Sequence, residues 1–128
     1  MTKKIIFTEK APAPIGPYNQ AVLVGDTLYC SGQIAIHPES GQLILEDVET
    51  ETHQVMTNLE AVLNAANMTF DNVVKSSIFM SNMDDFKTIN TVYGSYFNEV
   101  NAPARETVQV ARLPKDVNVE ISVIATAF

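Results

Sequence analysis

The alternation of hydrophobic and polar residues predicts a chain of mixed strands and helices. Period-two alternation and short apolar runs indicate about six strands, whereas apolar residues at spacings of three and four indicate two helices. This order predicts an α+β domain with a single core. The expected strands are residues 4–8, 20–24, 27–34, 73–81, 104–111 and 117–127, and the expected helices run from an N-cap at Asp47 to about Ala66 and from about Asp84 to Glu99.

Glycine and proline residues set specific expectations near the N-terminus. Gly25 and Asp26 lie between two expected strands and predict a two-residue hairpin turn. Gly32 lies inside a strand, where glycine indicates either a β-bulge or a group that approaches the backbone closely. The proline-rich segment 11–17 breaks regular structure and predicts a stiff loop that delivers Tyr18.

The last two strands each have an aliphatic face and a polar face. Val108 points away from Arg105, and Ile121 points away from Glu120. Two helices can cover only one face of such a sheet, so we expect the aliphatic residues beneath them. The other face, with Arg105 and Glu120, is then expected to meet solvent or another subunit.

Composition narrows the classes of protein. A chain of 128 residues fits one domain, residues 1–128, with no repeat or linker. The net charge of −7, with scattered basic residues, argues against nucleic acid and anionic membranes as partners. The N-terminus lacks a signal-peptide core and no run is long enough to span a membrane, so we expect a cytoplasmic protein.

Few residues are candidates for chemistry. His37 and His53 have no second ligand at metal spacing, and Cys30 alternates with core residues, so surface histidines and a structural thiol are the simpler interpretations. The chain has no serine-centred nucleophile elbow, phosphate-binding glycine loop or dinucleotide fingerprint. Arg105 and Glu120 remain, although such a pair on neighbouring strands is more often a surface ion pair than a site.

Five separated motifs resemble the RidA/YjgF family of enamine and imine deaminases, and the resemblance covers nearly the whole chain. The C-terminal motif combines Pro103-Ala104-Arg105, the segment from Val108 to Asp116, and Val119-Glu120-Ile121. The others are Ala11-Pro12 with Ile15-Gly16-Pro17-Tyr18, Ser31-Gly32-Gln33-Ile34, Glu51-Thr52 with Gln54 and Asn58-Leu59, and Asp85-Phe86 with Asn90 and Tyr93.

The resemblance implies a chorismate-mutase-like fold, with a mixed sheet of about six strands and two helices on one face. It also implies a homotrimer with the sheets around the threefold axis and the active clefts between subunits. The alternation alone would pair strands 104–111 and 117–127 as a hairpin. The family fold instead implies that strand 73–81 lies between them.

The implied reaction is hydrolysis of 2-aminoacrylate-type enamines and their imines, such as 2-iminopropanoate and 2-iminobutanoate, to 2-oxo acids and ammonia. These imines are released by pyridoxal-phosphate enzymes of amino-acid metabolism, and the resemblance implies no cofactor or metal in the deaminase. Arg105 would clamp the substrate carboxylate and Glu120 would activate water. The other expected substrate-binding residues are Tyr18, Ser31, Gly32, Asn90 and Thr107.

Two residues depart from the family pattern. Glu106 and Thr107 stand where relatives often have a small residue and a cysteine. By parity, Glu106 should lie on the face opposite Arg105 and should not neutralise it. A non-catalytic trimer that binds small carboxylates or a regulatory partner is the main alternative. Ribonuclease or translation-inhibitor activity also has family precedent but fits the acidic composition poorly.

Overall fold

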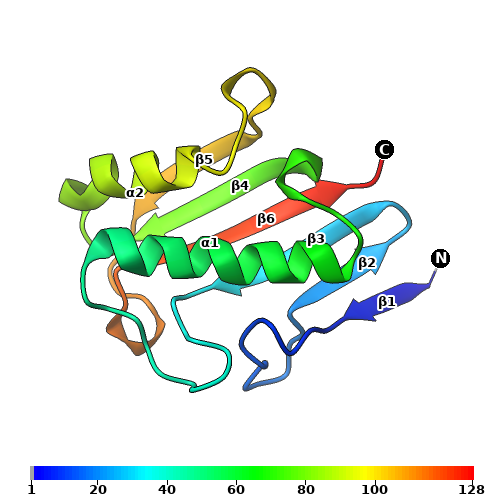
Figure 1. Cartoon of the computed structure of the whole chain (residues 1–128), viewed down its shortest axis with the longest axis horizontal. Coiled ribbons are helices and arrows are strands. Elements are labelled where there is room, and N and C mark those ends of the chain that lie inside the picture. Colours follow the sequence, from blue (N-terminus) through cyan, green and yellow to red (C-terminus); the bar gives the residue numbers. More distant parts are fainter. Residues whose placement is uncertain (1) are drawn as a thin grey trace.

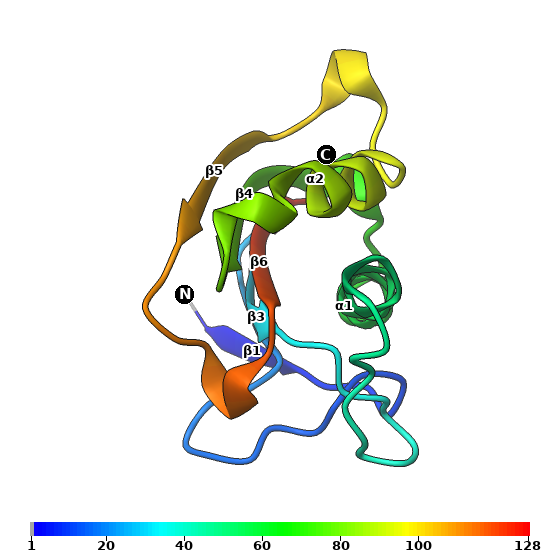
Figure 2. The same cartoon turned by 90° about the vertical axis from the view of Figure 1, so that its left-hand side faces the viewer.

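The computed structural model describes residues 2–128, which form one six-stranded mixed sheet with two α-helices on one face (Figures 1 and 2). Four of the five strand pairings are antiparallel, and only β4 and β5 run parallel to each other. The elements are β1 (Lys3–Ile6), β2 (Ala21–Val24), β3 (Thr27–Gln33), α1 (Val48–Ala65), β4 (Val73–Met80), α2 (Phe86–Gly94), β5 (Ala104–Gln109) and β6 (Val119–Thr126).

The strand order is β1-β2-β3-β6-β4-β5. β4 therefore separates β5 from β6, as the family resemblance implied, and the simple hairpin between the last two strands does not form. The parallel pairing of β4 with β5 follows from the chain path, because α2 carries the chain back across the sheet between them. The expected hairpin at Gly25 is confirmed: Val24 pairs with Thr27, and Gly25 has a φ of 60°.

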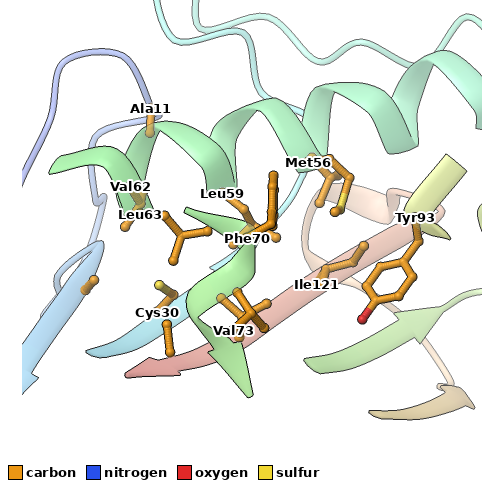
Figure 3. Close-up of a cluster of buried hydrophobic side chains, with 14 of the residues drawn as sticks. Ala11, Cys30, Met56, Leu59, Val62, Leu63, Phe70, Val73, Tyr93 and Ile121 are labelled. Carbon is orange, nitrogen blue, oxygen red and sulfur yellow. The ribbon is translucent and has the colours of Figure 1, made fainter. Parts of the chain in front are cut away.

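Helix α1 begins and ends as the sequence predicts. The Thr50 amide donates to the Asp47 carboxylate at 2.7 Å, which caps the helix, and Asn67 adopts a left-handed φ of 59° just after its end. Its apolar stripe, including Met56, Leu59 and Leu63, is fully buried against the sheet (Figure 3). This layer is the core of the protein.

Helix α2 is shorter than predicted, because it ends at Gly94 rather than near Glu99. Glycine is a poor helix former, and beyond it the chain turns so that Tyr96 and Phe97 contact Phe70 edge-on. Val100, whose apolar side chain continues the spacing of the helix, is 98% exposed in a short 3₁₀ turn. The spacing of apolar residues thus continues past the end of the helix into a turn whose aromatic rings are partly buried.

The two faces of β5 are the reverse of the expectation. Arg105 pairs with Ser76 of β4, whose side chain is buried beneath α2, so Arg105 lies on the helix-covered face. Val108 lies on the other face and is 41% exposed. In β6 the expectation is confirmed, because Ile121 is buried beneath the helices and Glu120 lies on the opposite face.

The sheet face opposite the helices is left uncovered within residues 2–128, and we call it the open face. It presents exposed or partly exposed apolar side chains, among them Tyr29, Phe79, Val108 and Ile124. In the same described range, neither α-helix is both long and apolar enough to cross a membrane.

Candidate active site

Arg105 is held at the edge of the sheet by side chains of α2. Its Nη1 donates a hydrogen bond to Asn90 Oδ1 at 2.7 Å. Its guanidinium carbon lies 5.2 Å from the centre of the Tyr93 ring and 5.9 Å from that of Phe86. These rings orient the guanidinium by cation–π contacts, and most of its N–H donors have no partner among residues 2–128.

Tyr93 links this arginine to the buried core. Its hydroxyl donates to Ser76 Oγ at 2.8 Å, and burial raises the pKa of the phenol above its usual range. The ring beside Arg105 therefore stays neutral at physiological pH. A neutral Tyr93 ring can pack against the Arg105 guanidinium, whereas a phenolate would form an ion pair with it and compete with an anionic ligand.

Thr107 follows Arg105 on the same face of β5, opposite Ile78 of β4. Its hydroxyl is buried and has no hydrogen-bond partner among the described residues. A buried hydroxyl without a partner is costly, which makes Thr107 a candidate for hydrogen bonding to a ligand. The structure thus places Asn90, Arg105 and Thr107, three of the predicted site residues, on one side of the sheet.

Glu120 lies on the other side. It is half-buried on the open face of β6, and burial raises the pKa of its carboxyl group. It borders a pocket of about 730 Å³ that Tyr18 and Gly32 also line, together with segments 12–15, 36–41 and 114–115. A carboxyl group with a raised pKa at the wall of a pocket has the properties of a general base.

Gly32 is the reason that Glu120 fits there. A Cβ atom at Gly32 would lie 2.8 Å from the carboxyl carbon of Glu120 and still closer to its Oε2. The register of β3 against β6 shifts between Cys30 and Gln33, which is the irregularity that a bulge produces. Both expectations for Gly32, a bulge and a close approach, are therefore confirmed.

Tyr18 and Ser31 belong to the same side but differ in exposure to the pocket. Tyr18 lines the pocket, and its hydroxyl accepts a 3.5 Å hydrogen bond from the Ile15 amide. Ser31 does not line it, and its hydroxyl donates to the Asn19 carbonyl at 2.5 Å. Ser31 thus fixes the end of the loop that carries Tyr18.

Gln20 is a residue of this site that the sequence analysis missed. It is buried, and its amide nitrogen donates to the carbonyls of Thr8, Ala11 and Pro12 at 3.0, 3.2 and 2.8 Å. Its side-chain oxygen accepts from the Thr8 amide at 2.8 Å. These bonds fold the proline-rich loop over the pocket. A lone glutamine at a strand end gave no signal of this role.

The predicted site residues thus form two separate groups. Arg105 pairs with Ser76 and Glu120 pairs with Phe79, three residues further along β4, so their Cα atoms are on the order of 14 Å apart. Their side chains also point to opposite faces of the sheet. Arg105 and Glu120 of one chain cannot contact the same small molecule.

Glu106 lies on the face opposite Arg105, as its parity predicted, and in the structure this is the open face. It forms a 2.7 Å ion pair with Lys75 and accepts a hydrogen bond from Ser77. These contacts lower the pKa of Glu106, first through the bond to Lys75 and then through the bond to Ser77. Its charge is engaged there, away from Arg105.

The described residues form no cluster of metal-binding side chains. Across residues 2–128, no three His, Cys, Asp or Glu side chains lie close enough together to hold a metal ion. The groups that the site offers are a guanidinium, amide and hydroxyl donors, and one carboxyl group in a partly apolar pocket. Such groups can bind a carboxylate and can move a proton.

Comparisons with known proteins identify the family. A sequence model described as Endoribonuclease L-PSP matches residues 8–127. A Bos taurus protein named 2-iminobutanoate/2-iminopropanoate deaminase is 50% identical over 125 residues, which are 98% of this chain and 90% of the relative.

Solved structures agree with this family assignment. The E. coli TdcF structure with bound serine has a TM-score of 0.92 and 42% identity, covering 98% of this chain and 99% of its own. YyfA from Yersinia pestis, described as a protein of unknown function of the conserved Rid family, has a TM-score of 0.95 and 45% identity, covering 98% and 100%. The chain therefore belongs to the RidA/YjgF family that its sequence motifs indicated, whose sequence model is described as Endoribonuclease L-PSP.

Proposed function

We propose that this protein hydrolyses 2-imino acids of the 2-iminopropanoate and 2-iminobutanoate type, and their enamine tautomers, to 2-oxo acids and ammonia. The substrate class is supported by the mammalian relatives of 46–50% identity that are named for this activity. The observation that carries the proposal is the Arg105 cluster, an oriented guanidinium with unused donors beside a free buried hydroxyl.

Arg105 binds the substrate carboxylate in this proposal. The carboxylate is the one fixed negative charge of a 2-imino acid, and a guanidinium can hold it through two parallel hydrogen bonds. The protein has a net charge of −7, so an anion needs a local cation to bind. Thr107 adds a hydroxyl donor on the same face, and Asn90 fixes the plane of the guanidinium.

Glu120 acts on water. Its carboxylate accepts a proton from a water molecule as the water oxygen forms a bond to the carbon of the protonated imine and the carbon–nitrogen π pair moves to nitrogen, which gives a neutral carbinolamine. Glu120 then returns that proton to the amino nitrogen. As the carbon–nitrogen bond breaks, Glu120 takes the hydroxyl proton and passes it to the departing ammonia, which leaves the 2-oxo acid and an ammonium ion. The raised pKa of Glu120 suits a group that takes and returns a proton near neutral pH.

The two groups act together only if they come from different chains. Because Arg105 and Glu120 of one chain lie on opposite faces of the sheet, a complete cleft needs the Arg105 side of one subunit and the Glu120 side of another. The uncovered apolar side chains of the open face supply a surface for such an assembly. We propose the homotrimer of the family, with three equivalent clefts between subunits.

The test generates 2-aminoacrylate from serine with a pyridoxal-phosphate dehydratase and follows 2-oxo acid formation. The wild-type protein should accelerate it, Arg105→Ala should not, and Lys87→Ala should match wild type, because Lys87 is an exposed cation on α2 with no ion pair in the described chain. Equal acceleration by wild type and Arg105→Ala would contradict the proposal.

A small-carboxylate-binding role without catalysis is the second candidate. It is favoured by one observation, the bound serine in the structure of the relative TdcF. Calorimetric binding of 2-oxobutanoate or serine that depends on Arg105, combined with no acceleration in the deaminase assay, would support binding without catalysis.

A further inference from the structure

Glu51 is a buried carboxylate that the proposed mechanism does not use. It lies in α1 and is 0% exposed, in contrast to Glu49 two residues earlier, which is exposed. It has no ion-pair partner among residues 2–128. A buried carboxylate without a cation is costly unless N–H groups bind it, so its hydrogen bonds indicate its role.

All of these hydrogen bonds go to the start of β6. Oε1 accepts from Asn118 Nδ2 at 2.7 Å, and Oε2 accepts from the Asn118 amide at 2.8 Å and the Val119 amide at 3.3 Å. These two residues directly precede Glu120. Glu51 therefore holds, from the helix side of the sheet, the backbone from which Glu120 projects to the open face.

The hydrogen bonds from Glu51 hold the backbone directly after a turn with a costly conformation. The preceding turn contains Lys115 and Asp116, both with a φ of 56°, a conformation that L side chains adopt at a cost. Asn118 is also tied to the end of β4, because its carbonyl accepts from the Ser81 amide at 3.1 Å. The first residues of β6 are thus held by α1 and by β4 at once.

The carboxyl group of Glu120 has little room to move. Its carboxyl group lies directly over the Gly32 backbone, so β3 limits its movement on one side. The anchor at residues 118–119 limits it at the other. We propose that Glu51 is a positioning residue for Glu120, which sets the distance of the general base from the pocket; this inference rests on the proposed deaminase function.

The test compares Glu51→Gln with a matched control. The glutamine keeps the size of the side chain but turns one acceptor into a donor that faces the Asn118 donors. The control, Asn72→Ala, removes a 3.0 Å hydrogen bond from Asn72 Nδ2 to the Thr126 carbonyl at the far end of the same strand. Both variants loosen β6, but only one loosens the end that carries Glu120.

The kinetic result should separate positioning from general destabilisation. In Glu51→Gln, kcat should fall about tenfold or more, whereas the Kd of 2-oxobutanoate should stay within about twofold, because the Arg105 side is untouched. Asn72→Ala should keep kcat within about twofold. A kcat loss of the same size in both variants, or none in Glu51→Gln, would overturn the proposal.

A second measurement does not depend on deaminase activity. The carboxyl ¹³C titration of Glu120, assigned with Glu120→Gln, reports how its surroundings change. Other titratable groups, Tyr18, His37, Glu39 and Lys115, line the same pocket, and Lys75 and Glu106 share the open face, so the comparison is between variants at matched pH. In the Glu51→Gln variant, the carboxyl group of Glu120 should become more hydrated, and the pKa of Glu120 should move toward its ordinary value.

The two readouts distinguish the possible failures. If the wild-type protein does not accelerate deamination, the proposed function is wrong. Independently of that result, an unchanged titration of Glu120 in Glu51→Gln would overturn the positioning role. If Glu51→Gln does not fold, Asn118→Ala removes the side-chain bond to Glu51 and a 3.4 Å bond that Asn118 Oδ1 accepts from Ser81 Oγ, keeps the two backbone bonds to Glu51, and should give a smaller shift in the same direction. No shift in that folded variant would equally overturn the inference.

Discussion

Replacing Gly32 by alanine should separate activity from stability. The added methyl group would lie 2.8 Å from the carboxyl carbon of Glu120, below the 3.0 Å that real Cβ contacts keep. To reach an ordinary contact of 3.4 Å, that carbon must move by about 0.6 Å and the nearer oxygen by more. The carboxyl group is the flexible end of a side chain, so it should move and the backbone should stay.

The expected change in the free energy of unfolding is small, whereas the expected change in kcat is large. A shifted rotamer costs roughly 0.5–1.5 kcal/mol, and alanine recovers about 0.4–1 kcal/mol by restricting the unfolded chain, because Gly32 does not have a left-handed φ. The net change in the free energy of unfolding should therefore lie within about 1 kcal/mol of zero. A base displaced by about 1 Å, in contrast, can lose about 10²-fold in kcat.

The assay measures kcat with enzymatically generated 2-aminoacrylate and the unfolding free energy with urea. A fall in kcat of about 10²-fold with nearly unchanged stability is expected. Full activity in Gly32→Ala would refute the idea that the close approach of this backbone positions the carboxylate proposed as the general base. Loss of more than about 3 kcal/mol of stability would show that the backbone, and not the side chain, gives way.

Three further outcomes follow from the geometry. Arg105→Lys should raise the KM for the imine about tenfold or more, measured by initial rates, because an ammonium cannot form the two parallel bonds of a guanidinium. Burial raises the pKa of Glu120 above 4.5, so the folded state keeps the carboxyl proton to a higher pH than the unfolded state does. The free energy of unfolding in urea should therefore fall as the pH rises from the unfolded pKa through the folded one, and Glu120→Gln should not show this fall. Thr107→Val should leave thermal stability equal or higher, because the buried hydroxyl has no partner among residues 2–128, yet should raise KM if that hydroxyl binds substrate.

Local signals in the sequence predicted most elements because local contacts determine them. Asp47 caps α1 through an amide three residues away, and Gly25 forms the turn of a hairpin. The end of α2 was misplaced because Tyr96 and Phe97 continue the apolar spacing although they lie in a turn beyond Gly94. Apolar spacing reports burial, and helices are only one way to bury a ring.

The faces of β5 could not be predicted from alternation alone. Alternation divides residues into two sets, but the register with β4 decides which set meets the helices. Arg105 lies beneath α2 because it pairs with Ser76, and nothing in residues 104–111 encodes that pairing. The family motifs predicted which residues form the site, and the structure divides those residues between the two faces of the sheet.

Gln20 and Glu51 were missed for a related reason. Each is a single polar residue whose partners lie far away in the sequence: Glu51 binds backbone amides 67 and 68 residues later. Gln20 binds carbonyls up to 12 residues earlier, in a loop without periodicity. Only the folded chain brings these groups together.

The most direct test of the shared cleft is complementation between two inactive variants. Arg105→Ala and Glu120→Gln are each purified, shown to be folded and inactive, and then co-assembled by joint refolding. In a homotrimer with clefts between subunits, an equal mixture should recover about one quarter of wild-type activity, because one cleft in four combines an intact Arg105 with an intact Glu120 from the neighbouring chain. No recovery in demonstrably mixed trimers would contradict a site built from two chains.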